Sequence, residues 1–122
     1  MKKLMLLTLT MGALALGSGA RAADTAPKTV IHVVTVSWKK DATPAQIQAA
    51  VEGVKALPAA FKGILRVWTN PIKVQGDRGF ALVMEFADEQ ALKDYSGSAA
   101  QLKWYEAYNV VREASTTFDI TN

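Results

Sequence analysis

The stretch from Val30 to Trp38, VIHVVTVSW, constrains the fold of this chain more than any other segment. It is dense in β-branched residues, which favour an extended strand. Successive side chains of a strand alternate between two faces, here His32, Val34, Val36 and Trp38 on one face and Ile31, Val33, Thr35 and Ser37 on the other. Because both faces carry apolar groups, we expect a central strand that is at least partly buried on both sides.

The next segment has the pattern of an amphipathic helix. Thr43 is a good N-cap, and Pro44 suits the first helical position. We expect this helix to end at Leu57, because Pro58 disfavours helical backbone in the residue before it. The later segments that we predict are an extended run over 64–69, a strand over 80–86, a short helix opened by Asp88, a helix over about 99–113 and a last strand over 115–120.

This order, βαββαβ with a split second helical region, predicts a fold in the α+β class. Helices on one face of an antiparallel sheet, the ferredoxin-like sandwich, are the natural packing for it. The sheet then has a second face that also carries apolar residues. A second copy of the chain, packed sheet against sheet, would cover that face with closed symmetry. We therefore expect a homodimer.

The first 22 residues have the composition of a secretory signal peptide. A basic start precedes an uncharged apolar run from Leu4 to Leu16, and Ala20-Arg21-Ala22 fits a cleavage site. We expect residues 1–22 to be removed, residues 23–29 to form a flexible leader, and residues 30–122 to form one domain. The mature protein would be periplasmic or secreted, with no membrane segment after cleavage.

Composition excludes several classes of function. The chain has 14 Lys+Arg and 11 Asp+Glu, but three of the basic residues lie in the signal segment, so the mature part has no net charge and no nucleic-acid footprint. It has no cysteine and one histidine, which excludes disulfides, a thiol nucleophile and a metal-ligand pattern. No glycine-rich phosphate loop follows a strand, so we expect no cofactor.

Four motifs, taken in order, resemble the stress-responsive A/B barrel family. They are a first strand with a histidine near its start and an aromatic-lysine end (Ile31 to Lys39), a helix from Thr43 to Pro58, the block Gly79 to Tyr95, and Phe118-Asp119 near the end. The block follows G-[FY]-x-x-x-[VM]-x-F-x-[DS]-x-x-A-L-x-x-Y. The resemblance implies a ferredoxin-like protomer whose antiparallel sheet pairs with another to form a dimeric α/β barrel.

A plant branch of that family contains polyketide cyclases, which resemble this chain at the strand-one histidine, here His32. Their Y-x-x-H-P-x-H stretch aligns with residues 95–101. Tyr95 is present, but Ser98 and Gln101 stand where the cyclases have histidines. The resemblance therefore implies His32 as the candidate catalytic residue, without the second histidine that a cyclase would use.

Three functions stay open at this point. The first is binding of a small, largely apolar molecule in a pocket between sheet and helices, in stress response, with His32, Tyr95 and Gln101 as polar contacts. The second is a cofactor-free cyclase, isomerase or monooxygenase in which His32 is the acid or base, since a neutral imidazole suits that role near pH 7. The third is a structural module with a filled core and no site, in which Tyr95 packs its ring and His32 bonds to a neighbour.

Overall fold

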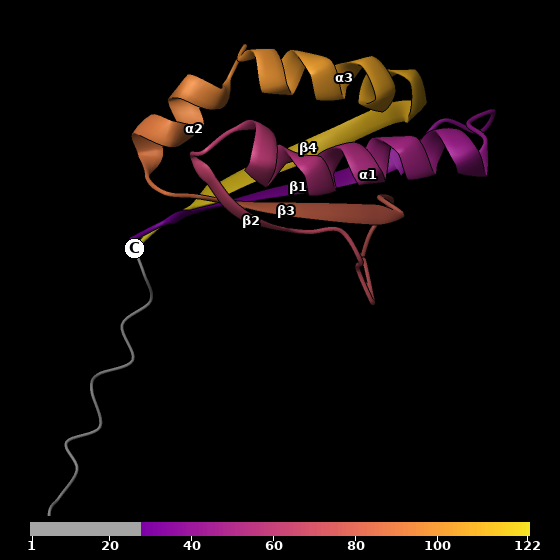
Figure 1. The fold of residues 1–122 in the computed structure, drawn as a ribbon. Helices are drawn as coiled ribbons and strands as arrows, with labels where there is room; N and C mark the ends of the chain where they lie inside the picture. The colour runs from indigo at the N-terminus through magenta and orange to yellow at the C-terminus, as the bar shows by residue number, and fades with distance from the viewer. Residues whose placement is uncertain (1–27) are drawn as a thin grey trace, which may run out of the picture.

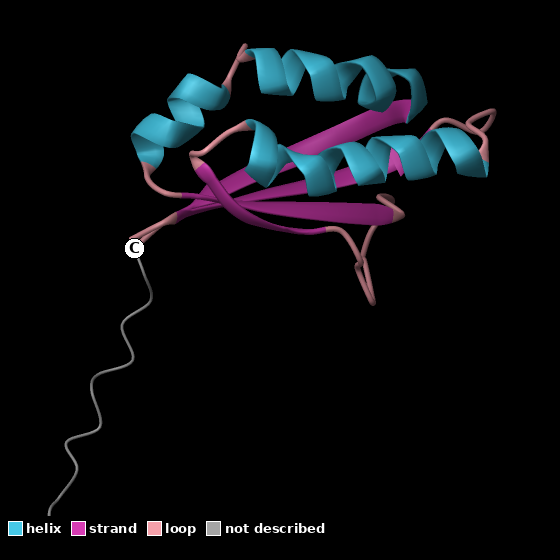
Figure 2. Cartoon of the chain, viewed as in Figure 1, coloured by secondary structure: helices cyan, strands magenta, loops and turns pink. Residues whose placement is uncertain are grey.

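The computed structural model describes residues 28–122, which form two layers (Figure 1). The predicted signal peptide and all but the end of the predicted leader lie outside these residues. Three helices lie over one face of a four-stranded antiparallel sheet, as the ferredoxin-like prediction requires (Figure 2). The elements are β1 (Val30–Trp38), α1 (Pro44–Ala60), β2 (Ile64–Trp68), β3 (Phe80–Phe86), α2 (Glu89–Tyr95), α3 (Ala99–Val111) and β4 (Arg112–Ile120).

The strand β1 is central, as its two apolar faces predict. The strand order is β2-β3-β1-β4, so β1 pairs with β3 on one side and with β4, the last element of the chain, on the other. In these registers His32 lies opposite Met84 of β3 and Asp119 of β4. Since directly paired residues share a face of the sheet, His32 and Asp119 are neighbours on the face beneath the helices.

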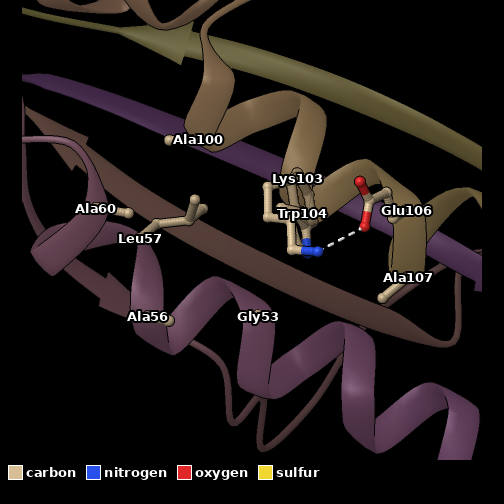
Figure 3. Close-up of a pocket in the computed structure, with 9 residues that line it drawn as sticks. All are labelled: Gly53, Ala56, Leu57, Ala60, Ala100, Lys103, Trp104, Glu106 and Ala107. Atoms are coloured by element: carbon tan, nitrogen blue, oxygen red, sulfur yellow. Dashed lines mark hydrogen bonds and ion pairs between the residues drawn. The ribbon is translucent and has the colours of Figure 1, made fainter.

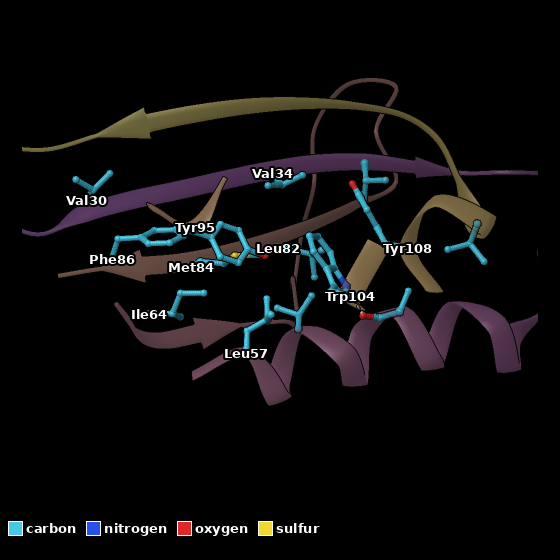
Figure 4. Close-up of a cluster of buried hydrophobic side chains, with 14 residues drawn as sticks. Val30, Val34, Leu57, Ile64, Leu82, Met84, Phe86, Tyr95, Trp104 and Tyr108 are labelled. Atoms are coloured by element: carbon cyan, nitrogen blue, oxygen red, sulfur yellow. Dashed lines mark hydrogen bonds between the residues drawn. The ribbon is translucent and has the colours of Figure 1, made fainter. Parts of the chain in front are cut away.

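The core fills the space between that face and the helices (Figure 4). Trp104 and Tyr108 are both buried, and their rings stack with centroids 4.3 Å apart. The indole Nε1 of Trp104 donates a hydrogen bond of 3.0 Å to the carbonyl oxygen of Ala50. This bond joins α3 to α1. Gly53 lies beneath the indole, where a Cβ would come within 2.8 Å of Trp104 Cδ1.

The predicted N-caps of α1 and α2 are confirmed, whereas two other predicted boundaries are wrong. Thr43 and Asp88 are N-caps, accepting hydrogen bonds from the backbone N–H groups of Gln46 and Ala91. The prediction that α1 ends at Leu57 is wrong: Pro58 lies inside the last turn, and the helix runs to Ala60. The helix can continue because the proline removes only one hydrogen bond, and Phe61 N–H still bonds to Leu57 O at 2.8 Å.

The boundary between α3 and β4 also lies earlier than predicted. Helix α3 ends at Val111 instead of Glu113, and β4 begins at Arg112 instead of Ser115. Arg112 already pairs with Trp38 of β1, after a bulge between Ser37 and Trp38. Pairing with the end of β1 therefore takes these residues into the sheet, which local helical periodicity does not reveal.

In the part of the chain that the structure describes, the other face of the sheet has no helix over it. We call it the open face. Apolar side chains occupy one part of it. Three of them are partly buried, Ile31, Val33 and Val83, and three are about half exposed, Trp68, Phe118 and Ile120. Glu85 lies at the edge of this apolar region and is buried, with Arg66 paired to it through Nε and Thr29 donating a hydrogen bond of 2.8 Å.

We predict that Gly53→Ala destabilises the protein by about 1 kcal/mol, although alanine is the better helix former. The new methyl group would displace an indole that stacking and the bond to Ala50 hold in place. Unfolding in urea measures the change. Gly79→Ala is the control, because a Cβ there meets nothing within 4 Å. Equal or greater stability of Gly53→Ala would contradict this account of the packing between α1 and α3.

We predict that Glu85 stabilises the fold in a pH-dependent way. Hydrogen bonds from Arg66 and Thr29 hold the pKa of Glu85 below its ordinary value of 4.5. The carboxylate therefore contributes its full stabilisation above about pH 4.5 and loses it as the pH falls through the folded-state pKa. Glu85→Gln should cost about 1–2 kcal/mol at pH 7, a difference that shrinks toward zero in acid.

Measurement of unfolding free energies between pH 3 and pH 7 tests this. Glu106→Gln is the matched control, because Glu106 is an exposed carboxylate paired with Lys103 at 2.8 Å, and such surface pairs contribute little. A stability difference between wild type and Glu85→Gln that does not change with pH would show that the charge of Glu85 is not what stabilises the fold.

Candidate functional site

His32 forms a close pair with a carboxylate of the neighbouring strand. Its Nδ1 lies 2.6 Å from Oδ1 of Asp119, across the β1–β4 ladder. The edge of the imidazole ring meets Phe86, with centroids 5.7 Å apart. The His32 side chain is 17% exposed and that of Asp119 is 45% exposed, so the pair lies at the margin of the core and is open to solvent on the Asp119 side.

The geometry assigns the proton roles of the ring. Because an ionised carboxylate only accepts hydrogen bonds, Nδ1 carries the proton and donates it to Asp119. In the neutral imidazole the other nitrogen, Nε2, is then the acceptor. A carboxylate in this position fixes the tautomer and the orientation of the histidine ring. The pair can therefore act as a general base or as an oriented acceptor for a ligand hydroxyl.

A pocket of about 190 Å³ lies beside this pair, between α2 and the edge of the sheet where β1 begins and β4 ends. Asp119 is one of its walls, whereas His32 is not among the residues that line it. Its other walls are apolar side chains and a few polar ones: Val30, Leu92, Ile120, Glu89, Lys93 and Thr121. The site thus combines a largely apolar concave surface with the carboxylate of Asp119, which holds His32 behind it. An apolar surface with a few polar groups is typical of small-molecule sites.

Tyr95, the second candidate from the sequence, is buried in the core and does not line this pocket. Its ring packs between Phe61 and Phe86, with centroid distances of 5.5 and 5.2 Å. Its hydroxyl is buried and has no hydrogen-bond partner within residues 28–122. Burial raises the pKa of Tyr95, so the phenol stays protonated. Phe86 contacts both Tyr95 and His32, but neither residue lines the pocket beside Asp119 or the two larger hollows of the protein.

Gln101, the third candidate, organises the start of α3. Its side-chain oxygen accepts a hydrogen bond of 2.6 Å from Gly97 N–H, and its amide nitrogen donates to the Tyr105 hydroxyl at 3.2 Å. Ser98, at the position of a cyclase histidine, is the N-cap of the same helix. The structure therefore places Ser98 and Gln101 together, away from the His32–Asp119 pair.

Two larger hollows lack comparable chemistry. One, of about 310 Å³, lies between α1 and α3 and is lined mainly by small residues, with the Lys103–Glu106 ion pair at its edge (Figure 3). The other, of about 400 Å³, lies between α1 and the segment after β2, beside Thr69 and Asn70. Within the described residues, no group of three or more potential metal ligands occurs, and no helix is long and apolar enough to cross a membrane.

Sequence reasoning did not identify Asp119 as a site residue. The pair Phe118-Asp119 is visible as a motif, but its relation to His32 depends on β4 pairing with β1 in one particular register. A signal was nevertheless available: in a ferredoxin-like order the last strand can lie beside the first, and a carboxylate near its end then faces the beginning of β1.

Comparison with known proteins agrees with this fold. None of the curated proteins matches the chain in sequence. Among solved structures, a dimeric protein of unknown function from Bacteroides fragilis has a TM-score of 0.65 at 19% identity, over 79% of this chain and 98% of that one. A hydroxynitrile lyase from Passiflora edulis has a TM-score of 0.65 at 16% identity, over 80% of this chain and 95% of that one.

A cofactor-independent oxygenase from Streptomyces nogalater has a TM-score of 0.60 at 17% identity, over 79% of this chain and 94% of that one. At these identities the likeness shows the fold alone. The family itself is shown by sequence, since the model of the stress responsive A/B barrel domain matches residues 30–122, the whole of the two-layer structure described above. The chain belongs to the stress responsive A/B barrel domain family.

Proposed function

We propose that this protein is exported, forms a homodimer through the open face, and binds a small, largely apolar molecule beside His32 in a stress response. The observation that carries the binding proposal is the 2.6 Å contact of His32 Nδ1 with Asp119, at the wall of an apolar-lined pocket. Export rests on the composition of residues 1–22, and the stress response rests on the family name.

The size of the pocket limits the ligand. At about 190 Å³ it is smaller than most pockets for drug-sized ligands. An apolar cavity of about 150 Å³ is large enough for benzene. The ligand is therefore a compact molecule of about one ring, with a polar group that can reach His32 Nε2 or the Asp119 carboxylate. Tyr95 would contribute through Phe86, which separates it from His32.

The second candidate function is cofactor-free acid-base catalysis. The orientation of His32 by Asp119 favours it, because the neutral ring presents Nε2 as a base and the carboxylate compensates the charge that develops. His32 would abstract a proton from a carbon or oxygen acid in the pocket and return it at another atom, as in a cyclisation or an isomerisation. The hydroxynitrile lyase and the cofactor-independent oxygenase support this candidate only by showing that the fold can carry enzymes.

We predict that His32 and Asp119 contribute to binding as a pair. Phenol and benzyl alcohol serve as single-ring probes, and the ring protons of the only histidine report binding in one-dimensional proton NMR. His32→Ala and Asp119→Asn should each weaken binding about 10-fold, the loss expected for one hydrogen bond of about 1.4 kcal/mol. For the histidine variant, isothermal titration replaces the NMR signal.

Asp77→Asn, the same chemical change in an exposed turn, is the matched control and should bind like the wild type. Unchanged binding in both site variants would refute the site and favour a structural module without one. If a compound that co-purifies with the protein is turned over by wild type and not by His32→Ala, while both bind it, the enzyme is favoured over the binding protein.

We predict that the mature protein is a dimer at micromolar concentration, because the exposed apolar side chains of the open face gain free energy by burial against a second copy. Light scattering tests this. Trp68→Asp places a charge on the open face and should give a monomer. Leu102→Asp is the control, since Leu102 is similarly exposed but lies on a helix of the opposite layer. A monomeric wild type would refute the sheet-to-sheet homodimer.

A further inference from the structure

We infer that the pocket beside His32 and Asp119 is incomplete in one protomer and that the second protomer closes it, so that ligand binding and dimerisation are coupled. The inference rests on the proposed homodimer and adds a property that the proposal does not contain. Three observations support this inference. They are the distribution of apolar residues on the open face, the position of the pocket relative to that face, and the exposure of the His32 and Asp119 side chains.

The first observation is that the open face is apolar at one end and polar at the other. Cross-strand pairs at the end near residue 120 are Ile31 with Ile120 and Val33 with Phe118. Toward the opposite end Thr35 pairs with Thr116 and Ser37 with Ala114, and Arg78 bonds to Ser37 and Thr116. Because burial of apolar area drives association, a second copy gains most by packing over the end that contains Ile120.

The second observation is that the pocket opens at this same end. The Ile31–Ile120 pair is adjacent to the His32–Asp119 pair in the register of β1 with β4. One residue along a strand corresponds to about 3.3 Å. Asp119 lies on the face of the sheet beneath the helices, and Ile120 lies on the open face. Both residues line the pocket. One residue, Ile120, is therefore part of the pocket wall and part of the surface that the second copy would cover.

The third observation is that this wall is open in the single protomer. Ile120 is 59% exposed and the Asp119 side chain is 45% exposed, whereas His32 behind it is 17% exposed. A protomer seated on Ile120 would narrow the opening and exclude water from the pair. Exclusion of water strengthens the hydrogen bond between His32 and Asp119 and any bond to a ligand.

Coupling follows from these three observations. If the closed pocket exists only in the dimer, a ligand binds the dimer more tightly than the monomer. By thermodynamic reciprocity the ligand must then stabilise the dimer by the same factor. The protein would release its ligand when it is diluted enough to dissociate.

The accessibility of His32 tests the closure without any ligand. Diethyl pyrocarbonate modifies a neutral imidazole, and because the chain has a single histidine the absorbance at 240 nm reports that residue alone. We expect the monomeric Trp68→Asp variant to react at least about 5-fold faster than the dimer, the lower end of usual coupling effects. Trp68 lies on β2, at the edge of the sheet opposite to β4, so its substitution does not alter the pocket directly.

Two further samples make the test independent of that variant. Leu102→Asp should remain dimeric and react at the wild-type rate. Sedimentation measures the concentration at which half of the wild-type dimer has dissociated. The rate at which His32 is modified should rise as the wild-type protein is diluted, with its midpoint at that same concentration. Equal rates for the His32 of monomer and dimer would overturn the inference, as would a wild type that is monomeric at every concentration. Neither result depends on the phenol titration, which tests ligand binding separately.

Discussion

The structure depends on one constraint: the sheet has two apolar faces, and residues 28–122 supply helices for only one of them. The strand β1 lies at the centre, buried by helices on one side and half covered on the other. In the core beneath the helices, Trp104 is hydrogen-bonded to Ala50 of α1 and packs against Gly53. The open face keeps Phe118 and Ile120 more than half exposed. Stability, assembly and the surroundings of the site all follow from how that second face is covered.

The open face also carries one buried charged group. Glu85 is buried there although a carboxylate is costly to desolvate, and it is tolerated because Arg66 and Thr29 satisfy it. Arg66 itself remains 63% exposed and lies 5.9 Å from the ring of Trp68. The apolar region of the open face is thus bordered by an ion pair whose two members are already paired within one protomer.

Local signals sufficed for most of the fold and for little of the site. Caps such as Thr43 and Asp88, the periodicity of α1 and the alternation of β1 are properties of neighbouring residues, and each was predicted. Pro58 and the start of β4 were misjudged because tertiary packing overrides local preference at the ends of elements. Asp119 was missed for a stronger reason: its role depends on a strand register that joins residues 87 apart in the sequence. The family resemblance pointed instead to Tyr95, which is buried in the core, and to Gln101, which bonds to Gly97 and Tyr105 at the start of α3.

The pairing of β1 with β4 also determines when the fold can be completed. Ile31 pairs with Ile120, so the central strand lacks one neighbour until almost the whole chain is available. Closing so long a loop before its contacts form makes folding slow, and no smaller unit of the chain contains a finished sheet. Until β4 is available, one side of β1 therefore keeps its backbone hydrogen-bonding groups unpaired within the sheet.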